Sequence, residues 1–145
     1  MAFYERIDKR KTIAKARIVL NEYSRFLKIL NNALYDLDGT KNSVAAFSSY
    51  VNADSMLIEA IDRKDRNYEI LQEYVNEIQR CINVLPLRHI EILNMRYVDD
   101  LTPEQIADRL SNHKHPVSVR QVRRRLSDSC LEFAIAYGVC IETHV

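Results

Sequence analysis

Glycine and proline are scarce in this chain. Only two glycines and three prolines occur among its 145 residues, so the stretches between helix-breaking residues are long. A β-sheet protein needs many turns, and turns depend on these residue types. The scarcity therefore favours an all-α fold, and 47% apolar content is enough for one domain or two small ones.

Cysteine and long apolar runs are limited as well. The three cysteines, Cys81, Cys130 and Cys140, form no C-x-x-C pair, and an odd number fits poorly with a disulfide framework. We expect reduced thiols, as in a cytoplasmic protein. No charged-then-apolar leader follows Met1, and no apolar run is long enough to span a bilayer. We therefore expect a soluble protein that does not act at a membrane.

The sequence also lacks the signatures of an enzyme. It contains no nucleophile–base pair, no glycine-rich phosphate loop and no cluster with the spacing of metal ligands. His113 and His115 lie two residues apart, but no second pair lies at a workable spacing, so we expect exposed loop histidines. These observations predict a protein without catalytic activity, cofactor or metal.

Acidic residues are missing from one segment, although the chain as a whole is nearly neutral with a formal charge of +1. Between Arg109 and Ser127 there are six basic residues and no acidic one. A neutral chain with one basic segment is typical of a local contact with a polyanion.

Two heptad patterns precede the basic segment. In each, apolar residues recur at alternating spacings of three and four, which predicts one apolar face on a long helix. The first consists of Ile13, Ala16, Leu20, Tyr23, Leu27, Leu30, Leu34 and Leu37. The second consists of Leu57, Ile61, Lys64, Tyr68, Leu71, Val75, Ile78, Ile82 and Leu85, with Lys64 as its polar member. Their similar lengths predict an antiparallel helical hairpin over residues 1–84.

The role of this hairpin stays open at the level of sequence. Its apolar faces can pack within one chain as a scaffold, or they can also form a homodimer, because both kinds of packing use the same pattern. The start of the first helix is crowded with basic residues, which usually form a solvated face and otherwise make a secondary phosphate contact. These residues are Arg6, Lys9, Arg10, Lys11, Lys15 and Arg17.

A short helix is expected after the hairpin. Pro86 suits its first turn, where the missing N–H is no loss. Asp99 and Asp100 are expected to end it. Its predicted inward face consists of Leu87, Ile90, Leu93 and Tyr97.

Two further helices open with a capping box, in which a hydroxyl group and a glutamine three residues later satisfy N–H groups at the helix end. Thr102 and Gln105 form the first box, and Ser118 and Gln121 form the second. Residues 111–117 join the helices in a turn longer than the three or four residues of the compact motif. This arrangement predicts a helix-turn-helix DNA-binding domain over residues 85–145, with the second helix in the major groove.

The second helix carries the candidate DNA-binding residues. Arginine can bond guanine O6 and N7 together, and glutamine can do the same for adenine. Arg120, Gln121 and Arg124 are predicted to read bases, because the N-terminal turns of a recognition helix enter the groove. Gln121 has an equally weighted alternative role as the cap of its own helix.

The remaining basic residues of this region are predicted to hold the DNA backbone, which positions a helix without reading sequence. They are Lys114, Arg123 and Arg125. The alternative is a helix face that charge merely keeps soluble, although charge pairs of mixed sign would serve that end better.

The sequence of this region resembles the region 4 helix-turn-helix of sigma-70-type factors. The matching residues are Leu85-Pro86, Ile92-Leu93-Asn94-Met95-Arg96-Tyr97, Leu101-Thr102, Gln105-Ile106-Ala107, Leu110, Ser118-Val119 and Val122. Gln105 stands where that family usually has glutamate, and the turn is longer by several residues.

The whole chain resembles the ArpU family of phage and prophage regulators, which is related to the RinA and LtrC late-gene activators. This resemblance implies a transcriptional activator of late phage promoters in a bacterial cytoplasm, with DNA contacts on Ser118 to Arg125. The implied partners are double-stranded DNA and bacterial RNA polymerase. Two alternatives stay open: a sigma-like adaptor that binds polymerase rather than DNA, and a helical protein of phage assembly.

Overall fold

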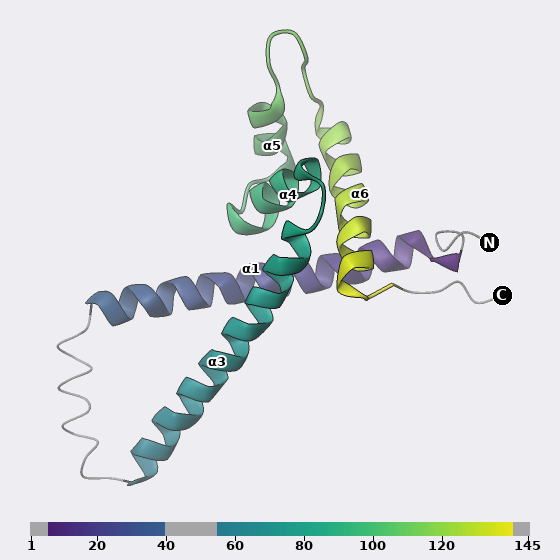
Figure 1. Ribbon diagram of the computed structural model, residues 1–145. Coiled ribbons are helices and arrows are strands. Elements are labelled where there is room, and N and C mark those ends of the chain that lie inside the picture. Colours follow the sequence, from purple (N-terminus) through teal and green to yellow (C-terminus); the bar gives the residue numbers. More distant parts are fainter. Residues whose placement is uncertain (1–5, 40–54, 141–145) are drawn as a thin grey trace. The chain divides into compact units, whose positions relative to one another are not determined.

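The computed structural model describes residues 6–39 and 55–140. Within these ranges every regular element is a helix (Figure 1). The elements are α1 (Lys9–Gly39), α3 (Ser55–Asn83), α4 (Leu87–Leu93), the π-helical turn η2 (Asn94–Val98), α5 (Pro103–Leu110) and α6 (Val119–Tyr137). The predicted all-α fold is therefore confirmed for the part of the chain that the structure describes.

The chain divides into two compact units. The first consists of Met1–Ser24 with Ile78–Val145, and the second of Arg25–Glu77. Both long helices therefore contribute to each unit. The boundary predicted between residues 84 and 85 stays a prediction.

The second unit consists of the facing parts of α1 and α3. The rings of Phe26 and Tyr74 meet edge to face, with their centroids 5.6 Å apart. One turn further along α1, the hydroxyl group of Tyr68 donates to the carbonyl oxygen of Leu30 at 3.4 Å. From one contact to the next, residue numbers rise along α1 and fall along α3, so the predicted antiparallel pairing of the hairpin is confirmed.

The heptad positions of both long helices are buried or half-buried wherever their side chains are described. Leu20 and Ile78 are fully buried, and so, within a few per cent, are the other members nearby: Ala16, Tyr23, Leu30, Val75 and Ile82. Ile18, Ile29 and Ile70 lie off the heptad patterns and are exposed. The half-buried members are Ile13, Leu27, Tyr68, Leu71 and Leu85. The members outside the described side chains are Leu34, Leu37, Leu57, Ile61 and Lys64.

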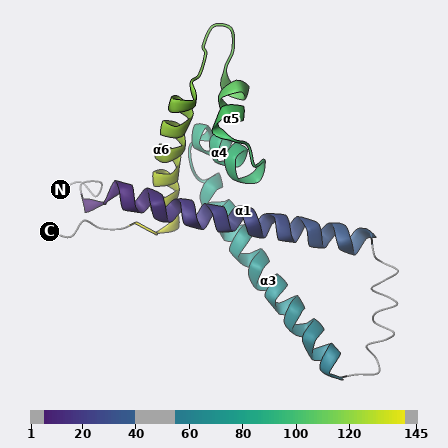
Figure 2. The ribbon, with the colours of Figure 1, turned by 180° about the vertical axis from the view of Figure 1, so that it is seen from behind.

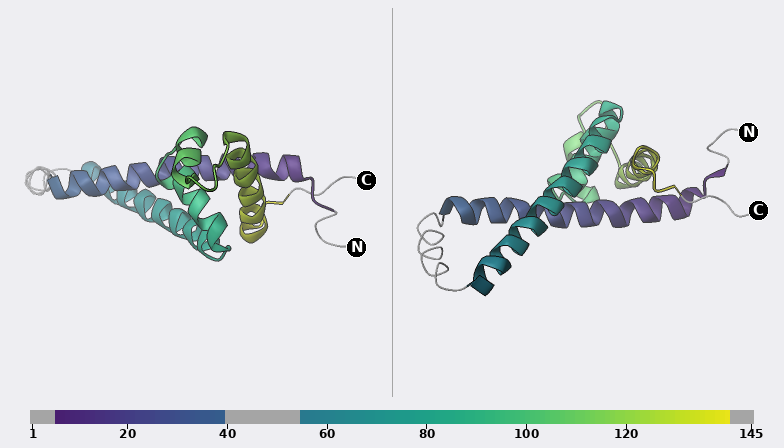
Figure 3. Two further views of the ribbon diagram at one scale, coloured as in Figure 1. Left: turned by 90° about the horizontal axis from the view of Figure 1, so that it is seen from above. Right: turned by 60° about the horizontal axis from the view of Figure 1, so that its bottom comes forward.

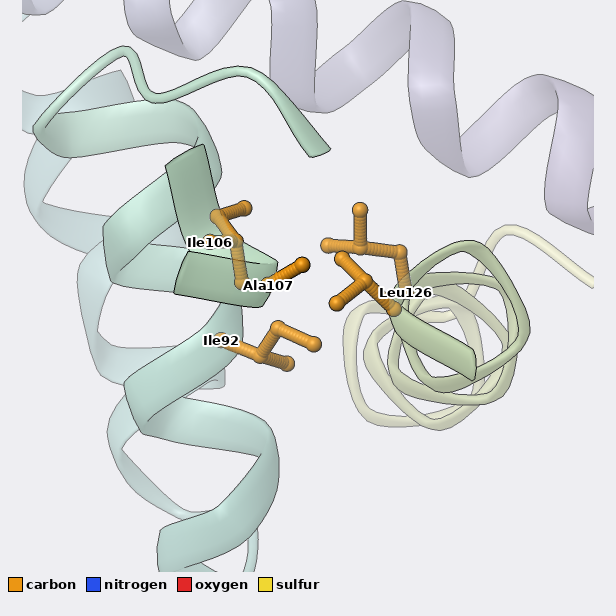
Figure 4. Close-up of a cluster of buried hydrophobic side chains, with 5 residues drawn as sticks. Ile92, Ile106, Ala107 and Leu126 are labelled. Carbon is orange, nitrogen blue, oxygen red and sulfur yellow. The ribbon is translucent and has the colours of Figure 1, made fainter. Parts of the chain in front are cut away.

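The first unit contains a small apolar core that joins α4, α5 and α6, the helices that lie together in Figures 2 and 3. Full burial of an aliphatic side chain of this size contributes about 1.5–3 kcal/mol to stability. Small Ala107 lets α5 approach the neighbouring helix closely. The core residues are Ile92, Ile106, Ala107, Val122 and Leu126 (Figure 4).

The predicted inward face of α4 is wrong in one respect. Leu87 is 68% exposed, whereas His89, Ile92 and Leu93 are buried. His89 occupies an inward position because its ring has a buried hydrogen-bond partner, the Ser129 hydroxyl, at 2.7 Å. That pairing turns the face opposite to Leu87 toward α6, which apolar periodicity alone did not predict.

The helix that begins at Leu87 ends where the two aspartates predicted its end. Its last turn, η2, is π-helical, and the N–H of Asp99 donates to the carbonyl oxygen of Asn94 at 2.9 Å. Asp100 then adopts a left-handed backbone conformation with φ 58°, which aspartate tolerates better than most residues. This turn redirects the chain toward α5.

Candidate nucleic-acid interface

Both helices of the motif begin at the residues that their capping boxes predict. At α5, the Thr102 hydroxyl accepts from the Gln105 N–H at 3.2 Å, and the Gln105 side chain accepts from the Thr102 N–H at 2.9 Å. At α6, the corresponding distances between Ser118 and Gln121 are 3.1 and 2.9 Å. Reciprocal bonds of this kind satisfy N–H groups at a helix start and fix where the helix begins.

The two faces of α6 differ as the sequence predicts. Val122, Cys130 and Phe133 are fully buried on one side of the helix. Arg120 and Arg124 are exposed, and on a helical wheel they lie away from this buried stripe. The first two turns of α6 therefore present guanidinium groups to the surroundings while the opposite face is anchored in the core.

Gln121 is exposed, but its side-chain oxygen is already engaged in the cap of α6. A bidentate contact with adenine needs both the oxygen and the nitrogen of the amide group. With the cap closed, one acceptor position of this oxygen is used and the amide group is held at the helix start. The geometry therefore favours the capping role over the base-reading role.

Arg123 lies beside a carboxylate, and Arg125 shares the lining of a hollow with two others. The Nη2 atom of Arg123 is 3.8 Å from Oε1 of Glu104, and these side chains are 66% and 61% exposed. An ion pair so exposed contributes little to stability, and a phosphate group can compete with it. Arg125 lines a hollow of about 390 Å³ together with Glu91 and Asp128.

The long turn between α5 and α6 is closed by its own hydrogen bonds. The N–H of Val117 donates to the Ser111 hydroxyl at 2.8 Å, which ties the two ends of the turn together. The side-chain oxygen of Asn112 accepts from the N–H groups of Lys114 and His115 at 3.0 and 2.7 Å. Asparagine commonly stabilises turns in this way. Lys114 is thereby held on an exposed segment, which forms the upper tip in Figure 1.

The two loop histidines, His113 and His115, are exposed, as predicted. Among the described residues, no group of three or more His, Cys, Asp and Glu side chains is placed to hold a metal ion. No helix in the described ranges is long and apolar enough to cross a membrane.

Tyr97 and Cys130 form a polar contact inside the first unit, with 3.8 Å between the phenol oxygen and the sulfur. Burial raises the pKa of Tyr97 above its ordinary value, and the nearby thiol of Cys130 adds to the effect. Burial also raises the pKa of the Cys130 thiol. A buried, protonated thiol is a packing group rather than a nucleophile.

Two arginines beside the motif make contacts that no pattern in the sequence predicted. Arg17 was assigned to the basic start of the first helix, but its Nη2 donates to the Ser127 hydroxyl at 2.9 Å. Arg96 was noted only within the sigma resemblance, and its Nη1 donates to the carbonyl oxygen of Leu101 at 3.2 Å. Arg17 and Ser127 are 110 residues apart in the chain, so no local sequence pattern predicts their contact.

Residues 76–131 match the family model described as Sigma-70, region 4. This part of the chain is a sigma-4-like helix-turn-helix. The match begins in the last part of α3 and includes both capping boxes and the arginines of α6. Region 4 domains bind DNA and RNA polymerase, so the match indicates a DNA-binding role in transcription. Comparisons with curated proteins and with solved structures gave no match.

Proposed function

We propose that this chain is a sequence-specific DNA-binding regulator that activates transcription. The supporting observation is the outward face of α6, where Arg120 and Arg124 are exposed on a helix whose start is fixed by the Ser118 cap. The opposite face of α6 packs on α4 and α5. A braced helix with outward arginines in its first turns suits entry into the major groove.

Base recognition is assigned to Arg120 and Arg124. Each guanidinium can bond O6 and N7 of one guanine, and a good bidentate contact discriminates against other bases by about 1–3 kcal/mol. Contacts with backbone phosphates are assigned to Lys114, Arg123 and Arg125. Ser118, at the start of α6, is assigned to the same DNA interface. Contacts of this second kind hold the helix in register without reading sequence.

The targets we propose are late promoters of a phage or prophage, in a bacterial cytoplasm. The resemblance to the ArpU family supports this part of the proposal. One module of this kind buries about 600–1,000 Å² of protein surface on DNA, which is little for tight binding at physiological salt. We propose that bacterial RNA polymerase, bound next to the regulator, adds the remaining affinity.

Homodimerisation through the long helices is a second source of affinity. Ile18, Ile29 and Ile70 are large apolar side chains that stay exposed on α1 and α3. Measurement of the mass of the chain in solution tests this proposal, with Ile29→Glu expected to convert a dimer into a monomer. A wild-type chain that is monomeric at all accessible concentrations contradicts it.

The DNA-binding proposal is tested by selecting bound sites from random duplexes and measuring affinity for the selected site at several salt concentrations. We expect a log–log salt slope of roughly −3 to −5 per monomer, as for 3–5 phosphate contacts. Arg124→Ala should lower affinity at least tenfold, whereas Arg66→Ala, an exposed arginine on α3, should leave it unchanged. Unchanged DNA binding by the Arg124 variant, together with binding to polymerase, would favour the adaptor role instead.

A further inference from the structure

A hollow of about 300 Å³ in the first unit brings three arginines together. Arg17 comes from α1, Arg96 from η2 and Arg123 from α6. Pro103, the first residue of α5, also lines the hollow, as does Asn21. The lining, as far as the structure describes the chain, includes no carboxylate.

Two of these guanidinium groups are held by neutral partners. Arg17 donates to the Ser127 hydroxyl at 2.9 Å, and Arg96 donates to the carbonyl oxygen of Leu101 at 3.2 Å. These bonds orient the side chains but leave their charges in place. Arg123 has Glu104 at 3.8 Å, outside the lining, in a pair so exposed that water screens most of the attraction.

Three cations that share one hollow repel one another, and an anion between them removes this repulsion. Arginine is suited to such a site because its planar fork can donate two parallel hydrogen bonds to a phosphate. The hollow therefore has the charge and the donor groups that a phosphate group requires.

We propose that this hollow binds one backbone phosphate of the DNA duplex whose major groove receives α6. The proposal rests on the function proposed above and extends it to α1, which lies outside the matched residues 76–131. In helix-turn-helix complexes the first helix of the motif crosses the DNA backbone. Pro103 begins that first helix here, and Arg123 lies on the second helix. The hollow between them therefore corresponds to the place where the DNA backbone passes beside the major groove.

The contact of Arg17 has a specific consequence. A phosphate contact carries no sequence information, so it raises affinity equally for all duplexes. The long N-terminal helix thus strengthens DNA binding without changing which bases are preferred. Arg17 is a backbone-binding residue, and base reading stays with α6.

The test compares three variants of the full chain on the selected duplex and on an unrelated duplex of equal length. Arg17→Ala should lower affinity about 5- to 10-fold on both duplexes and make the salt slope shallower by about 1. Lys15→Ala removes the same charge from the same helix at a position that does not line the hollow, and it should change affinity less than twofold. Ser127→Ala removes the internal partner of Arg17 but keeps the charge, so the salt slope should stay as in the wild type.

Several outcomes overturn the proposal. An equal loss with Lys15→Ala indicates diffuse attraction rather than a site, and an equal loss with Ser127→Ala indicates a structural role for Arg17. If Arg124→Ala loses affinity and Arg17→Ala does not, the phosphate-binding role of the hollow is wrong, whereas the proposed function is supported. If the wild-type chain binds no duplex, both are wrong.

Duplexes with a single methylphosphonate, which removes the charge of one phosphate, locate the contact directly. We expect one position in the selected site at which the substitution weakens the wild type and has no further effect on the Arg17→Ala variant. Equal losses for both proteins at every position contradict the assignment. If Arg17→Ala abolishes binding of inorganic phosphate but leaves DNA binding unchanged, the hollow is a small-anion site instead.

Discussion

The side-chain oxygen of Gln121 lies 2.9 Å from the backbone nitrogen of Ser118, and the Ser118 hydroxyl accepts from the Gln121 N–H at 3.1 Å. This pair fixes the start of α6 and engages the side-chain oxygen that Gln121 would use to read adenine. The proposed function therefore assigns base recognition to Arg120 and Arg124 rather than to Gln121.

Loss of the cap should affect stability rather than sequence preference. Ser118→Ala should lower the free energy of unfolding by about 1 kcal/mol, as for other serine N-caps. Gln121→Ala should leave the preferred DNA sequence unchanged, because the amide oxygen of Gln121 is held in the cap. Urea unfolding and a repeated site selection measure the two effects. Loss of a preference for adenine at one position in the Gln121→Ala selection contradicts this account.

The buried pair of His89 and Ser129 predicts a stability effect inside the motif. Ser129→Ala leaves the imidazole Nδ1 buried without its partner at 2.7 Å, which should cost about 1–3 kcal/mol. The double variant His89→Leu with Ser129→Ala removes both polar groups and should recover part of that loss. Chemical unfolding of the wild type, of Ser129→Ala, of His89→Leu and of the double variant gives the coupling energy. A coupling near zero shows that the hydrogen bond does not stabilise the fold.

The corrected face of α4 predicts a contrast between two aliphatic residues. Ile92 is buried in the core cluster, and Ile92→Ala should cost about 2–5 kcal/mol. Leu87 is exposed, so Leu87→Ser should change the unfolding free energy by less than about 0.5 kcal/mol. The midpoints of urea unfolding test both values. A large loss of stability with Leu87→Ser would instead show that Leu87 faces inward, as the sequence periodicity predicted.

Burial of Tyr97 predicts how stability depends on pH at the alkaline end. Its pKa is raised above the ordinary value of 10.0, so the unfolded chain loses the phenol proton at lower pH than the folded chain does. The stabilising contribution is complete below pH 10 and is lost as the pH rises beyond that value toward the folded pKa. Tyr97→Phe should therefore flatten the decline of stability above pH 10, as measured by urea unfolding at a series of alkaline pH values. A pH profile of this variant that equals the wild-type profile contradicts the burial argument.

Local signals in the sequence predicted the starts of α5 and α6, because a capping box acts over three residues. The heptad patterns likewise predicted the buried faces of α1 and α3, since each helix carries its own periodicity. The contacts of Arg17 with Ser127 and of His89 with Ser129 were not predictable, because 110 and 40 residues separate the partners. The three-arginine hollow depends on four separate elements, so no single stretch of sequence reveals it.

The most direct test of the account replaces guanines of the selected duplex, one at a time, with 7-deazaguanine, which lacks the N7 acceptor. We predict a guanine whose replacement weakens the wild-type chain about tenfold and has no further effect on the Arg124→Ala variant, because the arginine and N7 form one contact. If every replacement affects the two proteins equally, Arg124 does not read a guanine through N7, and the proposed recognition face of α6 is wrong.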